Sequence, residues 1–66
     1  MIIKATITID GDRWAKHPYG VEFNDSECED KYGINGLNRR EDCYRIIERA
    51  RAAGYDIDYD IEERFY

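Results

Sequence analysis

The chain is poor in the residue types from which most catalytic sites are built. It has one histidine, His17, and one serine, Ser26, and Pro18 directly follows the histidine. A nucleophilic site needs a nucleophile beside a base that a third group orients, and no such set has support in this sequence. Residues 33–36 contain two glycines but lack the lysine and the length of a phosphate-binding loop. We therefore expect that the protein is not an enzyme.

Soft metal ligands are equally scarce. His17, Cys28 and Cys43 form neither a CxxC nor an HxxxH pair. Cys43 also falls on the apolar stripe of a predicted helix, where a thiol packs as a small hydrophobe. We expect no zinc site.

Three aspartates near the C-terminus, Asp56, Asp58 and Asp60, resemble the first half of a calcium loop. That loop needs glycine at its sixth position, and Ile61 stands there. A strand would also point these carboxylates in parallel rather than toward one ion. We expect neither a metal nor another cofactor.

Long apolar runs are missing as well. Residues 1–3 are apolar but Lys4 interrupts them, and no run approaches the roughly 7 to 15 residues of a signal peptide. The chain is also far from the roughly 20 apolar residues of a transmembrane helix. We expect a cytoplasmic protein without a membrane partner, and because disulfides are rare in a reducing interior, we expect Cys28 and Cys43 to be thiols.

The chain has the size and composition of one folded domain. Its 66 residues are 42% hydrophobic and 14% aromatic, which argues against disorder. A domain of this length buries only about 60% of the surface that its unfolded chain exposes. We expect one compact domain over residues 1–66, with surplus aromatic surface left for a partner or for a second copy in a homodimer.

Alternating and helical patterns predict its elements. Residues 2–9 and 19–23 are predicted strands separated by a turn at 10–12. Asp25 or Ser26 can cap a short helical turn that ends near Gly33.

The clearest helix covers residues 39–53, with Asn38 as its N-cap and Gly54 closing its C-terminus. A last strand is predicted over residues 55–66. The expected fold is α+β, with a small antiparallel sheet of about three strands, one amphipathic helix on one face, and the order β-β-α-β.

The last predicted strand has two unlike faces. Tyr55, Ile57, Tyr59 and Ile61 alternate with the acidic residues Asp56, Asp58, Asp60 and Glu62. Since residues two apart in a strand are about 6.6 Å apart, the acids form an evenly spaced negative row above an apolar underside. Residues 55–66 carry five acidic side chains and one basic (−4), within a net charge of −5.

Two interpretations of the acidic row remain open. A sheet that a helix covers on one side shows polar residues to water on the other, and charge protects an edge strand from aggregation. Alternatively, the acids imitate the phosphates of a nucleic acid and fit an arginine-rich groove. In that case the expected partner-binding residues are Asp56, Asp58, Asp60, Glu62, Tyr66 and Trp14. Lys4 is expected to pair with one of the acids if the first and last strands are neighbours.

In size and charge the chain resembles the small inhibitors that phages and mobile elements make against host nucleases, including anti-CRISPR proteins. This resemblance rests on no motif, so no residue role is carried over. It implies an inhibitor that occupies a basic, nucleic-acid-binding surface of a larger protein.

Two alternatives remain. One is a homodimeric accessory or antitoxin-like regulator that buries Tyr59 and Phe65. The other is a nucleic-acid-binding module that uses the arginines of the helix, although the interleaved acids Glu41, Asp42 and Glu48 make direct nucleic-acid binding the weaker expectation.

Overall fold

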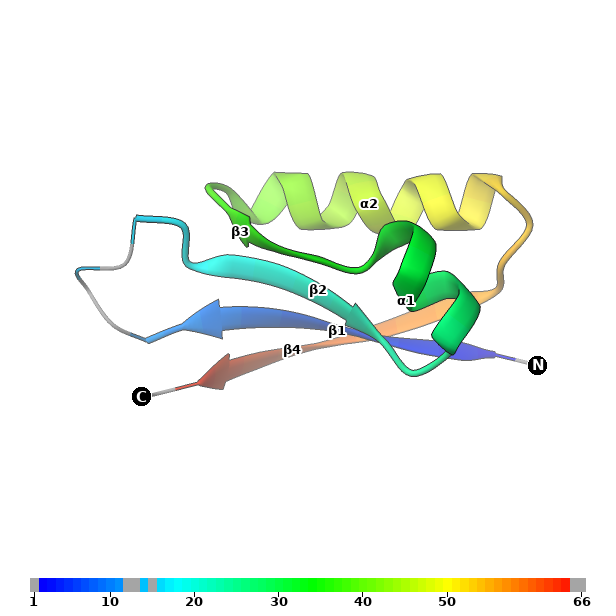
Figure 1. Ribbon diagram of the computed structural model, residues 1–66, viewed down its shortest axis with the longest axis horizontal. Helices are drawn as coiled ribbons and strands as arrows, with labels where there is room; N and C mark the ends of the chain where they lie inside the picture. Colours follow the sequence, from blue (N-terminus) through cyan, green and yellow to red (C-terminus); the bar gives the residue numbers. More distant parts are fainter. Residues whose placement is uncertain (1, 12–13, 15, 65–66) are drawn as a thin grey trace.

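The structure is a computed structural model that describes residues 2–11, 14 and 16–64. Six elements follow one another in the order β-β-α-β-α-β (Figure 1). They are β1 (Ile3–Asp10), β2 (Tyr19–Phe23), α1 (Ser26–Tyr32), β3 (Ile34–Leu37), α2 (Arg40–Ala52) and β4 (Ile57–Arg64). Across the described ranges, neither helix has the length and the apolar character that crossing a bilayer requires.

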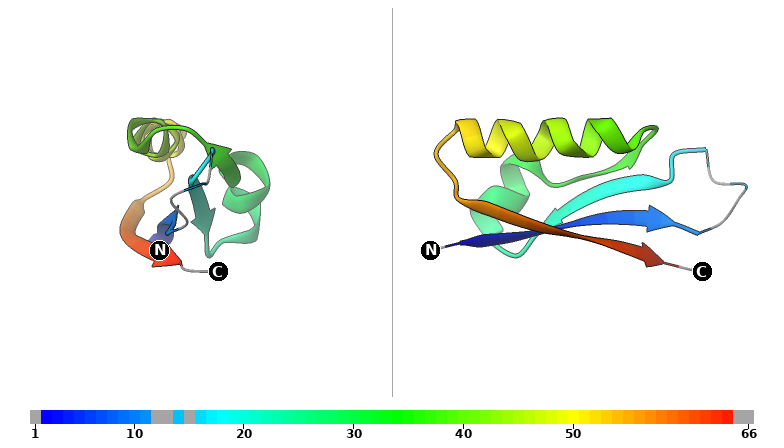
Figure 2. Two further views of the ribbon diagram at one scale, coloured as in Figure 1. Left: turned by 90° about the vertical axis from the view of Figure 1, so that its left-hand side faces the viewer. Right: turned by 180° about the vertical axis from the view of Figure 1, so that it is seen from behind.

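The four strands form one mixed sheet in the order β3-β2-β1-β4. β1 pairs antiparallel with β2 and parallel with β4, and β2 pairs antiparallel with β3. Both helices lie on the same side of the sheet, and α2 returns the chain from β3 at one edge to β4 at the other (Figures 1 and 2). The sheet therefore has one covered face and one open face.

The core lies between the covered face and the helices. Alternate residues of β1, the inward residues of β2 and the first residue of β4 meet the apolar stripe of α2 and one cysteine of α1, as strand and helix periods dictate. The buried residues are Ile3, Ala5, Ile7, Val21, Phe23, Cys28, Cys43, Ile47, Ala50 and Ile57. The apolar stripe predicted for α2 is confirmed at Cys43, Ile47 and Ala50, with Ile46 partly buried beside them, whereas Ala53 and Gly54, predicted to extend it, are exposed.

The helix ends follow local sequence signals. The Asp25 carboxylate accepts the Cys28 N–H at 3.0 Å and so caps α1 as predicted. At the other end of α2, Gly54 takes φ +102°, and the amides of Gly54 and Tyr55 bond back to Arg51 and Ala50. This pair of bonds is the Schellman motif, which the glycine makes possible.

The start of α2 was predicted wrongly. Arg39, not Asn38, occupies the N-cap position, and its side chain makes no capping hydrogen bond. The Asn38 side chain instead contacts Nδ1 of His17 in the β1–β2 connection. The side chain of Asn38, which the sequence predicted as the N-cap, is therefore engaged in a tertiary contact instead.

The α+β class is confirmed, but the predicted antiparallel three-strand sheet with one helix and the order β-β-α-β is wrong. The sheet has a fourth strand, β3, and a second helix, α1. The missed strand also explains the wrong direction of the last one. The chain changes direction at each successive strand and again at α2. Because β3 adds one change of direction between β2 and α2, β4 runs parallel to β1 and not antiparallel as expected.

We expect Gly54→Ala to lower the free energy of unfolding by about 1 kcal/mol, because a side chain at positive φ is sterically disfavoured. Urea unfolding followed by circular dichroism measures the change. Ala53→Ser is the control, since Ala53 is exposed and has the ordinary helical φ of −79°, and should shift stability by less than about 0.5 kcal/mol. Equal losses in both variants would contradict the role given to Gly54.

Candidate functional site

The open face of the sheet is the candidate site, because it combines charged side chains with the absence of a covering layer among the described residues. Here the open face means the side chains that alternate with the core residues of β1, β2 and β4. Its members are Lys4, Thr6, Thr8, Asp10, Glu22, Asp58, Asp60, Glu62 and Arg64. Both helices lie on the opposite side of the sheet (Figure 2).

The parallel register of β1 and β4 arranges these side chains in crosswise pairs. Lys4 lies beside Asp58, Thr6 beside Asp60, Thr8 beside Glu62 and Asp10 beside Arg64. β2 adds Glu22, which lies opposite Thr6 on the other side of β1. Asp60 and Glu62 thus lie beside the small hydroxyl side chains of Thr6 and Thr8, which leave both acids accessible.

The open face is strongly acidic even after its own cations are counted. Five carboxylates, those of Asp10, Glu22, Asp58, Asp60 and Glu62, stand against the two cations of Lys4 and Arg64, so the face carries −5 + 2 = −3. This excess of carboxylates over cations raises the affinity of the face for a positively charged partner.

Lys4 bridges the first two acids of β4, which confirms the predicted cross-strand pairing. Its Nζ lies 3.2 Å from Asp60 and 3.6 Å from Asp58. The hydrogen bond that Lys4 donates to Asp60 and the charges of both acids raise the pKa of Lys4 above its ordinary value. The side chain of Lys4 is 49% exposed and those of Asp58 and Asp60 are 66% and 68% exposed, so water competes with these ion pairs.

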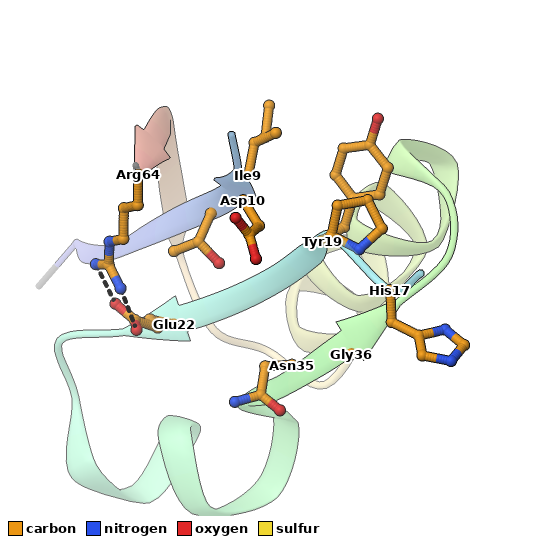
Figure 3. A pocket seen from close by; sticks show the side chains of 10 residues that line it. Ile9, Asp10, His17, Tyr19, Glu22, Asn35, Gly36 and Arg64 are labelled. Carbon is orange, nitrogen blue, oxygen red and sulfur yellow. Dashed lines mark hydrogen bonds and ion pairs between the residues drawn. The ribbon is translucent and has the colours of Figure 1, made fainter. Parts of the chain in front are cut away.

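Arg64 organises the other end of the face. It reaches from β4 across β1 and donates two hydrogen bonds to Glu22 on β2, at 3.0 and 2.9 Å (Figure 3). Its Nη2 also lies 3.5 Å from Glu62. The fork-to-fork geometry of an arginine and a carboxylate fixes this end more firmly than a lysine would.

A shallow hollow of about 330 Å³ lies at the same end of the sheet, between Asp10, Glu22 and Arg64 on one side and Asn35 on the other. Gly20 lies between two residues that line the hollow, because a Cβ there would meet the Thr8 hydroxyl oxygen at 2.8 Å and the Asn35 Cβ at 3.1 Å. His17 lines the rim, but its ring points away from Glu22 (Figure 3).

The structure brings together three of the six predicted partner-binding residues. Asp58, Asp60 and Glu62 lie in one row on β4, as predicted. Asp56 precedes the strand: its carbonyl accepts the Ile3 N–H at 2.8 Å and its side chain is exposed. The predicted strand over 55–66 therefore began two residues too early.

Of the other two predicted residues, the structure describes Trp14, which lies apart from the row. Trp14 is 78% exposed in the connection between β1 and β2, at the end of the sheet where Arg64 lies. Tyr66 falls outside the described residues, as does Phe65, so their predicted roles stay predictions.

The sequence analysis missed Asp10, Glu22 and Arg64 as members of the site. Glu22 alternates with the apolar Val21 and Phe23, so the two-residue period already assigned it to the opposite face from the core. Its approach to Arg64 depends on β4 running parallel to β1, which the sequence pattern did not indicate.

The two cysteines and the remaining acids offer no metal centre in the described ranges. Cys28 and Cys43 are free and fully buried, and burial raises the pKa of both thiols. Within residues 2–11, 14 and 16–64, no three His, Cys, Asp or Glu side chains are grouped as metal ligands. The thiols therefore serve the core.

The arginines of α2 are partly occupied by their own chain. Arg51 donates to the Ile57 carbonyl and to Glu48, and Arg45 lies 3.8 Å from Asp42. These internal pairs reduce the positive charge that α2 presents to a nucleic acid.

Comparisons of the chain with models of protein families, with curated proteins and with solved structures found no match.

We expect Lys4→Gln to destabilise the protein at pH 7 and low salt, because Asp58 and Asp60 would lose the cation between them. The pKa of Lys4 is raised in the folded state, so its stabilising contribution is present below the ordinary lysine value of 10.5 and disappears as the pH rises through the raised value. Urea unfolding at pH 7 and above the raised pKa should show the difference between wild type and variant closing, and added salt should reduce it.

Lys16→Gln is the matched control for this charge, since Lys16 is exposed and makes no ion pair with the described residues. A loss as large as that of Lys4→Gln would show that overall charge, and not the bridge, determines stability.

Proposed function

We propose that the protein is a non-enzymatic inhibitor that acts in the cytoplasm by occupying a basic, nucleic-acid-binding surface of a larger protein with the open face of its sheet. The observation that carries this proposal is the charge of −3 on an uncovered sheet face, with Asp58, Asp60 and Glu62 in a row along one strand. A basic groove is the complementary surface.

The spacing of the row supports mimicry of a nucleic acid. Acids two residues apart on a strand are about 6.6 Å apart, broadly the separation of successive phosphates along a nucleic-acid strand. A carboxylate accepts the two-pronged hydrogen bonds of arginine as a phosphate does. Arginines that are spaced to bind successive phosphates would therefore meet carboxylate acceptors at a similar spacing.

The internal ion pairs of the face do not prevent such binding. Ion pairs between exposed side chains contribute little to stability, because water and salt screen them. The side chains of Lys4, Asp58 and Asp60 are about half exposed or more, so a partner arginine can replace Lys4 at little cost in free energy. In the free protein Lys4 thus partly neutralises Asp58 and Asp60, and a partner arginine would replace it in the complex.

Neutralising the row should weaken binding to a basic probe while leaving the fold intact. We expect Asp58→Asn with Asp60→Asn to reduce the affinity for a fluorescent nona-arginine peptide at low salt by about tenfold. Fluorescence anisotropy measures the affinity, and circular dichroism checks the fold. Lys4→Gln should strengthen binding, because it removes the competing internal cation.

The matched control is Asp30→Asn with Glu41→Gln, which changes the net charge equally but on exposed positions of α1 and α2. If the control weakens binding as much as the change on β4, or if the peptide does not bind at all, the open face is only a solvated surface and the proposal fails.

A further inference from the structure

The outer edge of β4 exposes backbone groups whose identity follows from its pairing with β1. The Ile3 amide donates to the Asp56 carbonyl, and eight residues later the Gly11 amide donates to the Arg64 carbonyl. In a parallel ladder every second residue directs both its N–H and its C=O to the neighbouring strand. Even-numbered residues of β4 therefore face β1, and the backbones of Ile57, Tyr59, Ile61 and Glu63 face outward.

The first half of this edge is closed by side chains of the same chain. The Arg51 guanidinium donates to the Ile57 carbonyl at 3.2 and 2.8 Å. The Tyr59 amide donates to the Asp58 carboxylate at 3.1 Å, and the Tyr59 ring packs 5.7 Å from that of Tyr44. A further strand could not pair here without displacing these contacts.

The second half of the edge is open. Among the described residues, no side-chain or loop hydrogen bond reaches the outward backbone groups of Ile61 or Glu63. Ile61 is 44% exposed, because its side chain points to the helix side of the sheet beyond the part that Tyr44 of α2 covers. An exposed segment of this kind is a template for an added strand.

The charges around this segment select what can be added. Asp60 and Glu62 flank Ile61 and project to the open face. A second copy paired antiparallel about Ile61 would set Asp60 of one chain opposite Glu62 of the other, and like charges directly opposite are destabilising. A strand with lysine or arginine at alternate positions would instead meet both acids, and an apolar residue between them would cover Ile61.

We propose that the segment from Asp60 to Glu63 binds an extended basic strand of the partner by β-strand addition, so that partner cations alternate with an apolar residue over Ile61. This inference rests on the proposed function and specifies how the basic partner is held. Backbone hydrogen bonds would align the partner strand with β4, and the acidic row would select a partner sequence with alternating cations.

The test separates backbone pairing from charge attraction. Ile61→Pro removes an outward N–H without touching the bonds to β1, and proline is tolerated on edge strands. The first probe is a ten-residue peptide of alternating lysine and valine; the second has the same composition in two blocks, five lysines followed by five valines. We expect wild type to prefer the alternating peptide, and Ile61→Pro to weaken that peptide by about tenfold with little effect on the block peptide.

Amide hydrogen exchange of the unmodified protein gives a second readout that does not depend on the variant folding. The amides of Ile61 and Glu63 should exchange at least about tenfold more slowly with the alternating peptide bound, whereas amides of β3, at the other edge of the sheet, should not change.

Each alternative result is decisive. If Asp58→Asn with Asp60→Asn weakens both peptides while Ile61→Pro and the exchange rates show no effect, strand addition is wrong and the proposed function survives. If neither peptide binds, both fail. If sedimentation shows a dimer without peptide that protects Ile61 and Glu63, the occupant is a second copy and the inference is overturned.

Discussion

The pairing of β1 with β4 is the interaction on which the rest of the structure depends. β1 is a central strand whose inward residues Ile3, Ala5 and Ile7 are buried, and its parallel partner adds Ile57 to the same core. The same register sets Lys4 beside Asp58 on the opposite face. One ladder therefore fixes the core, the ion pairs and the position of the acidic row together.

The open face follows from the side on which the apolar residues of the strands lie. Both helices of the described residues, α2 with 13 residues and α1 with seven, pack on that apolar side. The core they close is small, and two of its ten buried residues are the cysteines Cys28 and Cys43. In an antiparallel or mixed sheet with helices on one side, the alternate residues of the strands face water on the other side. Packing of the core therefore does not restrict which residue types stand there.

The sequence predicts the parts of the fold that follow from strong local patterns. The alternation in residues 3–9, the apolar stripe of α2 and the glycine after it are all found as expected. β3 escaped prediction because its four residues include Asn35 and Gly36, which are poor strand formers, and it forms only by pairing with β2. Missing that strand reversed the expected direction of β4, and with it the register that brings Arg64 to Glu22.

The acidic residues of β4 answer two physical demands at once. A bare edge strand invites pairing with any extended chain, and charge on that edge discourages pairing with copies of itself. The protection is selective, because a carboxylate that repels another acidic strand attracts a basic one. Arg51 and Asp58 hydrogen-bond the backbone of the first half of the edge and close it. The second half, which Asp60 and Glu62 flank, is open. In the proposed complex, the residues that disfavour pairing of this edge with a second copy are therefore also the residues that select a basic partner strand.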